Sequence, residues 1–297
     1  MNKRNKHKLT SMQLVMLALF SLIDKLSSKV AGYFLFTLWL MPGIKKKKHD
    51  RALPESSEQY WLRVREKRIA YWLCGTGPTV LFVHGWGSYG AQFSMLINAF
   101  YSAGYRVIWF DAPAHGLSSG WQTNIFEIHE CISSLQAKYG HFDIVIGHSF
   151  GALSSMRAVS EGLSVSKLVT LSSPSNAIGL MDKFCFFFNP SEKSKLEMKG
   201  RIEKKYGDDL WDVTSVKTMA KKIRQSVLII HDKDDRMISC KEGIANKRKL
   251  DKAELVLTEH LGHNRIVQNE DVANKILDFA HGRNTKTNLG LNNQQAG

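Results

Sequence analysis

The sequence predicts an α/β fold in which helices flank a mostly parallel sheet. From about residue 79 to residue 280, short apolar segments without internal charges alternate with amphipathic segments. Strands buried on both faces are continuously apolar, and the helices between them return the chain for parallel pairing. A chain of 297 residues with 43% hydrophobic residues is long enough to bury such a core.

The elements are expected in the following order. Residues 60–67 and 68–75 predict a β-hairpin, and Gly75-Thr76-Gly77-Pro78 turns the chain into an apolar strand at 79–85. Further strands are expected at 105–111, 142–147, 167–173, 226–232 and 253–259. Helices are expected near 90–103, 124–138, 152–160, 241–250 and 271–280, with a long insert at 177–224. Sites in such sheets form at the carboxyl ends of the strands.

Residues 1–52 are predicted to form a helical, basic N-terminal extension. Its two apolar runs, 12–23 and 30–41, are each shorter than the ~20 residues that a membrane-spanning helix needs. A cleaved signal peptide is not expected, because no small-x-small site follows the first run and a second apolar run does. Two interpretations stay open: the helices cover the protein's own surface, or they lie in a membrane interface.

The charge is concentrated in this extension. Eleven Lys and Arg against two Asp give it +9 of the chain's +14, which leaves +5 for the rest. This distribution favours an anionic membrane surface as a partner and disfavours nucleic acid. The four cysteines are widely spaced, which predicts a reduced, cytoplasmic protein, peripheral on the inner face of the cell membrane if the extension binds lipid.

Two G-x-S-x-G segments offer a candidate nucleophile. Ser149, in Gly147-His148-Ser149-Phe150-Gly151, follows an apolar strand directly and precedes a predicted helix. This strand–turn–helix context is that of a nucleophile elbow, whose tight turn leaves room only for glycine two residues away on each side. Ser118 lies in a loop after Pro113 and precedes a polar stretch, so we expect it to stabilise a turn.

A serine hydroxyl needs a general base, and the base needs an orienting acid. His263 follows the last predicted strand and is the expected base, with His260 as the competitor. His148 is too close to Ser149 along the chain to point back at it. For the acid, the loop after strand 226–232 offers three aspartates, which the residues alone leave open: Asp232, Asp234 and Asp235.

An oxyanion hole requires backbone N–H groups aimed at the developing negative charge. The N–H of Phe150, at the start of the helix after Ser149, is one expected donor. The second is expected from the loop His84-Gly85-Trp86-Gly87, with the Trp86 N–H favoured. No metal or organic cofactor is expected.

Four segments together resemble the α/β-hydrolase superfamily, over about residues 58–280. They are HGWGS, DAPAHGLSSG, GHSFG, and HDKDD followed by Gly262-His263. In this combination the chain is similar to a group of bacterial α/β hydrolases of unassigned substrate that also begin with a helical, basic extension. The resemblance implies a hydrolase domain at 53–281 and places the insert at 177–224 where these hydrolases carry a lid. The insert is expected to form either an apolar wall of the site or a small separate core under a solvated helix. The polar composition from Gly282 onward predicts a disordered tail at 282–297.

The resemblance also assigns roles. It places the nucleophile on Ser149, the base on His263, and the acid four residues after His231, on Asp235. This chain has Asp232 where the family usually has glycine, so Asp234 stays an alternative for the acid. Asp111 and His115 fall on a structural loop of the family. The expected activity is hydrolysis of carboxylic esters through an acyl-enzyme. Thioester or carbon–carbon bond hydrolysis, or a membrane-associated binding protein without turnover, are the alternatives.

Overall fold

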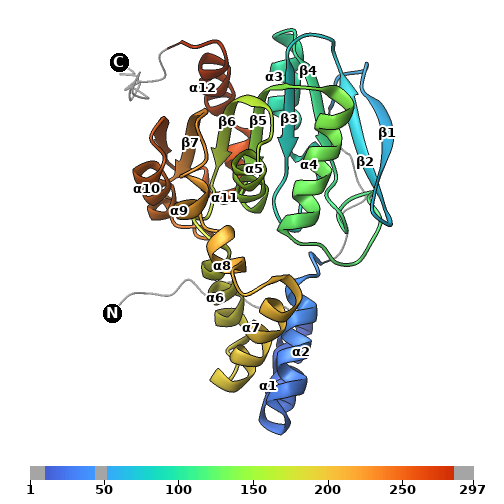
Figure 1. Ribbon diagram of the computed structural model, residues 1–297, viewed down its shortest axis with the longest axis vertical. Helices are drawn as coiled ribbons and strands as arrows, with labels where there is room; N and C mark the ends of the chain where they lie inside the picture. Colours follow the sequence, from blue (N-terminus) through green and yellow to red (C-terminus); the bar gives the residue numbers. More distant parts are fainter. Residues whose placement is uncertain (1–10, 44–51, 284–297) are drawn as a thin grey trace, which may run out of the picture.

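The computed structural model describes residues 11–43 and 52–283 and has an eight-stranded sheet at its centre (Figure 1). Its strand order is β1-β2-β4-β3-β5-β6-β7-β8. The first two strands join antiparallel, β2 joins β4 antiparallel, and every later pair is parallel. The strands are β1 Glu58–Val64, β2 Lys67–Cys74, β3 Thr79–Val83, β4 Arg106–Phe110, β5 Phe142–His148, β6 Val165–Leu171, β7 Ser226–Asp232 and β8 Ala253–Thr258. The predicted hairpin and the predicted mostly parallel sheet are both present.

Helices cover both faces of this sheet, as the fully apolar strands require. One core joins the sheet to α4 (Ile125–Tyr139) and α5 (Phe150–Ser160). The other joins it to α3 (Ser94–Ser102) and α12 (Glu270–Ala280). Helix α10 (Cys240–Lys249) packs beside β7 and β8. A short 3-10 helix, η1 (Gly90–Phe93), precedes α3.

The region after β8 differs from the expected loop. Residues Gly262–Arg265 form a one-turn helix, α11, and Ile266–Gln268 continue it as the 3-10 helix η2. His263 therefore lies in a helical turn. The physical reason is that Ile266 and Val267 are buried in the core beneath α3 and α12, which pulls this short segment against the sheet.

The insert and the N-terminal extension pack together below the sheet (Figure 1). The insert contains α6 (Ala177–Phe188), α7 (Glu192–Tyr206), α8 (Leu210–Val213) and α9 (Val216–Met219). The extension contains α1 (Ser11–Leu26) and α2 (Ser28–Trp39), and α2 lies along α7. A third core forms between them, with Phe20, Leu35 and Met198 almost fully buried. Part of the extension thus covers the protein's own surface.

Among the described residues, no helix is long and apolar enough to cross a membrane. The basic stretches at 1–10 and 44–51, and most of the tail predicted at 282–297, lie outside the described residues. The domain boundaries predicted at residues 52 and 281 stay predictions.

Candidate active site

Ser149 lies in a strained turn between β5 and α5. Its backbone has φ 54° and ψ −121°, a left-handed φ that costs a non-glycine residue about 1–3 kcal/mol. A Cβ on Gly147 would lie 2.5 Å from the Ala152 Cα, and one on Gly151 would lie 2.3 Å from the backbone oxygens of Val83 and His84. Gly147 therefore lets the turn fold onto the start of α5, and Gly151 lets it sit against the end of β3. This turn projects the Ser149 side chain from the carboxyl end of β5.

Three side chains from separate loops form a hydrogen-bonded chain at this edge. The Ser149 hydroxyl lies 3.0 Å from the His263 Nε2, and the His263 Nδ1 lies 2.7 Å from the Asp235 Oδ2. With Nδ1 donating to the carboxylate, Nε2 is left to accept the serine proton. Ser149 follows β5, Asp235 follows β7 and His263 follows β8, so the carboxyl ends of the strands bring them together.

The Asp235 carboxylate is held ionised by its donors. Burial acts to raise the pKa of Asp235, but His231, His263 and the Ile238 N–H hold that pKa well below its usual range. The N–H groups of Met237 and Ile238 each donate to its Oδ1 at 2.8 Å. A buried carboxylate with this many donors is a fixed negative charge, suited to stabilising an imidazolium.

The other two aspartates of the loop have different partners. The buried Asp232 accepts from Thr258, Leu261 and Gly262 and so ties the ends of β7 and β8 together. The exposed Asp234 accepts from the N–H of His260 and lies 3.0 Å from its Nδ1. The structure thus joins Asp235 to His263 and leaves the competing pair, Asp234 and His260, at the surface.

Ser118, in the second G-x-S-x-G segment, is fully buried and is not part of this hydrogen-bonded chain. Its hydroxyl donates to the Asp111 carbonyl at 2.5 Å and accepts from the Ala70 N–H at 2.9 Å. Ser118 therefore fastens its loop to β2. The Asp111 side chain also has a structural role, since it accepts from the N–H groups of Gly90 and Leu117 at 2.8 Å.

The loop after β3 lies directly against the elbow. A Cβ on Gly85 would approach the Ser149 Cβ to 3.0 Å, and the rings of Trp86 and Phe150 pack edge to face at 5.3 Å. The Gly87 N–H donates to the His115 Nε2 at 3.0 Å. The Gly87 N–H is thus already hydrogen-bonded. The neighbouring Trp86 N–H is therefore the candidate oxyanion donor from this loop, and the Phe150 N–H at the start of α5 is the candidate from the elbow.

Sequence reasoning missed a structural role for His148. Its Nε2 donates to the backbone carbonyl of His263 at 2.8 Å and so links the elbow to the histidine turn. Burial, then the nearby His263, lowers the pKa of His148 to about 3, so the ring stays neutral, and this bond holds its proton on Nε2. The sequence held no sign of it, because the two residues are more than a hundred positions apart.

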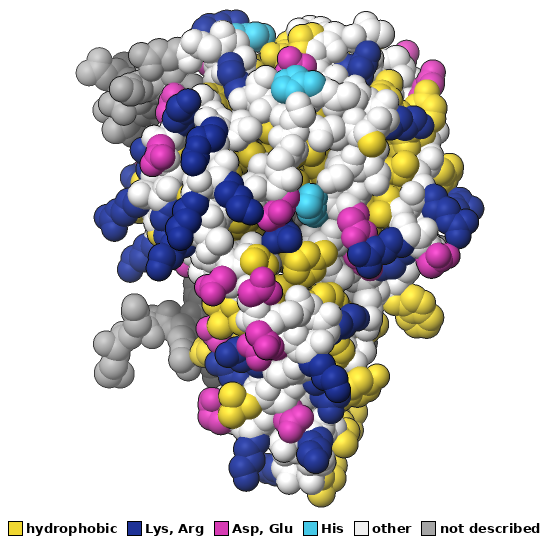
Figure 2. All heavy atoms as spheres, in the orientation of Figure 1, with side chains coloured by type: hydrophobic (Ala, Val, Ile, Leu, Met, Phe, Trp, Pro, Cys, Tyr) yellow, Lys and Arg dark blue, Asp and Glu magenta, His cyan; other side chains and the backbone are white. Residues whose placement is uncertain are grey.

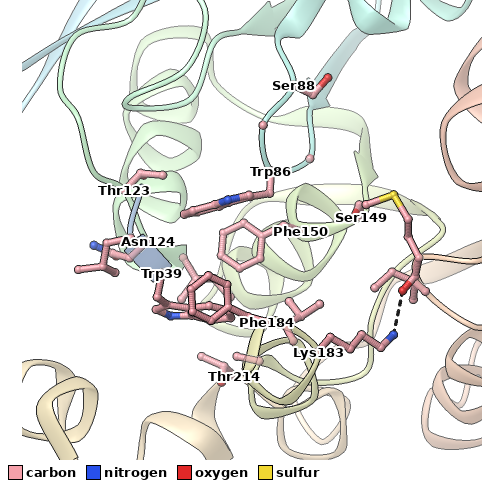
Figure 3. A pocket seen from close by; sticks show the side chains of 18 of the residues that line it. Trp39, Trp86, Ser88, Thr123, Asn124, Ser149, Phe150, Lys183, Phe184 and Thr214 are labelled. Carbon is pink, nitrogen blue, oxygen red and sulfur yellow. Dashed lines mark hydrogen bonds between the residues drawn. The ribbon is translucent and has the colours of Figure 1, made fainter. Parts of the chain in front are cut away.

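A cavity of about 710 Å³ opens over Ser149 and is mostly apolar (Figure 3). Trp86 and Phe150 line it from the sheet side, and Phe184, Tyr206 and Trp211 line it from the insert. The N-terminal extension supplies part of the wall through residues 38–41, and Trp39 packs edge to face on Phe184 at 5.5 Å. This contribution of the extension was also not foreseen.

Residues 78–196 match the family model described as alpha/beta hydrolase fold. Among solved structures, the esterase PF2001 from Pyrococcus furiosus has a TM-score of 0.63 and 21% identity, covering 82% of this chain and 98% of that one. The fold, the site geometry and the family match agree: the chain has the α/β-hydrolase fold, and residues 78–196 carry its resemblance to the α/β-hydrolase superfamily. The more specific bacterial group suggested by the sequence stays a prediction.

Two curated relatives are similar over shorter stretches. The magnesium-chelatase 30 kDa subunit of Rhodobacter capsulatus is 36% identical over 97 residues, 30% of this chain and 34% of that protein. The pimeloyl-[acyl-carrier protein] methyl ester esterase of Vibrio atlanticus is 34% identical over 105 residues, 35% of this chain and 40% of that protein. The chain thus matches less than half of the length of each relative.

Proposed function

We propose that the protein is a serine hydrolase that cleaves carboxylic esters through a Ser149–His263–Asp235 triad. The observation that carries the proposal is the continuous chain of hydrogen bonds from the Ser149 hydroxyl through His263 to the ionised Asp235, at the base of an apolar cavity. A serine in a strained elbow with an oriented base is the arrangement that acyl transfer requires.

The reaction proceeds in two halves. His263 Nε2 takes the Ser149 proton as the oxygen attacks the ester carbonyl, and the same histidine then gives that proton to the departing alcohol. The N–H groups of Trp86 and Phe150 hold the oxyanion in each tetrahedral intermediate. Water, deprotonated by His263, attacks the acyl-enzyme, and the carboxylic acid leaves as Ser149 regains its proton. Asp235 stabilises the imidazolium in both halves.

The cavity favours a substrate with an apolar acyl or aromatic group. Burying such a group against the aromatic walls contributes roughly 25 cal/mol to the binding free energy for each square ångström of apolar surface removed from water. The Vibrio atlanticus relative bears the name of a methyl ester esterase, which supports an ester over a carbon–carbon bond as the scissile group.

Hydrolysis of p-nitrophenyl esters with increasing acyl length tests this function. We expect turnover that Ser149→Ala abolishes, with kcat/KM rising as the chain lengthens until the cavity is filled. Hydrolysis of a parallel series of acyl thioesters tests the alternative, in which the leaving group is a thiol. Well-folded protein that hydrolyses neither series would support a binding protein without turnover and would overturn the proposal.

A further inference from the structure

The helical pair α1–α2 has an outer apolar face that no described element covers. Five large side chains of α1, each between 54% and 77% exposed, recur at helical spacing and form what we call the outer row: Leu14, Val15, Leu19, Leu22 and Leu26. Val30 and Tyr33 of α2, at 55% and 56% exposed, extend this surface. Hydrophobic side chains gather along the lower right edge in Figure 2, where Figure 1 places α1 and α2.

The side of α1 and α2 opposite the outer row makes their packing contacts with each other and with the insert. Phe20 stacks on Phe34 at 5.9 Å and meets Phe188 edge to face at 5.4 Å, while Leu35 is fully buried. The outer row is therefore not needed to hold α1 and α2 on the insert. Exposed apolar surfaces of this extent mark sites of interaction with a partner or a membrane.

The charges around the outer row identify an anionic partner. Lys25, in the last turn of α1, and Lys29, in the first turn of α2, are exposed, and the Arg201 guanidinium lies 5.3 Å from the Tyr33 ring. The carboxylate within these two helices, Asp24, faces the insert, where it accepts from the N–H and hydroxyl of Ser191 and from Ser194. In sequence, four Lys and Arg precede α1 and five follow α2.

We propose that this face binds the surface of an anionic phospholipid bilayer, with α1 lying in the plane of the interface. A helix face of aliphatic side chains bordered by lysines is the pattern of an interfacial helix. Each Lys or Arg close to an anionic surface adds to the attraction, which salt screens. Since residues 38–41, at and just after the end of α2, line the cavity, binding would set the cavity next to the lipid. The binding itself does not depend on the proposed hydrolysis.

Co-sedimentation of the full chain with lipid vesicles tests the proposal. We expect binding to vesicles that mix phosphatidylcholine with phosphatidylglycerol to exceed binding to phosphatidylcholine alone by about tenfold or more, and to weaken as salt rises. Replacing both Leu19 and Leu22 by Ser should lower the partition coefficient by on the order of tenfold or more. The matched control is Met95→Ser with Tyr101→Ser, two exposed apolar side chains on α3, at the other end of the molecule (Figure 1).

A second pair of variants tests the charge. Lys25→Gln with Lys29→Gln should weaken binding to the anionic vesicles by roughly fivefold for each lysine. Lys241→Gln with Lys252→Gln, two exposed lysines elsewhere, should leave it unchanged. All four substituted residues are exposed, so thermal melts should match the parent chain and show that each variant is folded.

Three results would overturn the proposal. The first is equal binding to neutral and anionic vesicles. The second is unchanged binding by the Leu19 and Leu22 variant when the control variant also binds normally. The third is a parent chain that does not bind vesicles and sediments as a dimer, while the Leu19 and Leu22 variant sediments as a monomer. The face would then pair with a second copy of the chain.

Discussion

The loop after β7 gives three neighbouring aspartates three different tasks through their hydrogen bonds alone. Asp232 fastens β7 to the turn after β8, Asp234 holds His260 at the surface, and Asp235 faces His263. Their side chains have the same chemistry, so backbone direction decides which carboxylate reaches the site. Substitutions that keep the shape and remove the charge can separate these tasks.

Asp235→Asn should lower kcat for ester hydrolysis by about three to four orders of magnitude, because the imidazole loses both its oriented tautomer and the charge opposite its cation. Asp234→Asn is the matched control, one residue away and exposed, and should retain most of the activity. Steady-state kinetics on a short ester measures both. If Asp234→Asn were the crippling change, the pairing seen in the structure would not be the functional one.

At the scale of single residues, the sequence predicted the geometry around Ser149 and left that around the aspartates open. The elbow is local, since a strand, two glycines and a helix all lie within a few positions of the serine. The choice between Asp234 and Asp235 depends on how a loop of consecutive carboxylates turns relative to His263. The position of His148 in the chain shows only that it cannot face Ser149, since its bond to the His263 carbonyl depends on two loops meeting in space.

The contact between α2 and α7 positions the helix whose end lines the cavity. A Cβ on Gly32 would lie 2.4 Å from the Glu197 Cβ and 3.1 Å from the Met198 N–H nitrogen. The two helices can approach this closely because α2 has glycine at the crossing. The far end of α2 then continues into the residues that wall the cavity.

Gly32→Leu should force α2 away from α7 and destabilise the protein by about 1–3 kcal/mol. The melting temperature should fall, and kcat/KM should drop more for long acyl chains than for short ones, because the outer wall of the cavity moves. Gly200→Ala on α7 is the control, since no atom lies within 4 Å of its Cβ and alanine favours a helix by up to about 1 kcal/mol. An unchanged melting temperature for Gly32→Leu would contradict the packing described.

Most strands and helices of the sheet domain were predictable, because the buried strands are continuously apolar whereas the helices repeat apolar residues every three to four positions. The helical turn of α11 was not, since its four residues are too short to show any period. The packing of the extension on the insert could not be predicted, because an apolar run indicates that a helix is buried but not which surface it is buried against.

Across the whole molecule, buried neutral histidines link the loops at the carboxyl edge of the sheet. The His84 Nε2 accepts from the Ala112 N–H at 2.9 Å, joining the loops after β3 and β4. Burial lowers the pKa of His84 to about 4, while burial and the nearby His263 lower that of His148 to about 3. The His84 Nε2 must stay unprotonated to accept its bond, and burial disfavours a charge on either imidazole.

This predicts a loss of stability in mild acid. A histidine whose pKa is lower in the folded state takes up its proton on unfolding, so stability is full above the unfolded pKa of about 6.5 and falls as the pH drops toward the folded pKa. Between about pH 7 and about pH 5, each of the two histidines should cost about 2 kcal/mol. Urea unfolding at a series of pH values measures the change.

His148→Gln should remove roughly half of this acid-dependent loss, since the glutamine amide can still donate to the His263 carbonyl but does not titrate. Identical pH slopes for the parent and His148→Gln would show that this histidine does not titrate on unfolding as described.

The central claim is that Ser149 is an activated nucleophile, and covalent labelling tests it most directly. A fluorophosphonate reacts with a serine whose hydroxyl is deprotonated by an oriented base and leaves ordinary serines unmodified. Peptide mapping of the labelled full chain should place the adduct on Ser149; Ser149→Ala should abolish labelling, and Ser118→Ala, provided that it folds, should retain it. An adduct on Ser118, or no adduct on folded protein, would contradict the account.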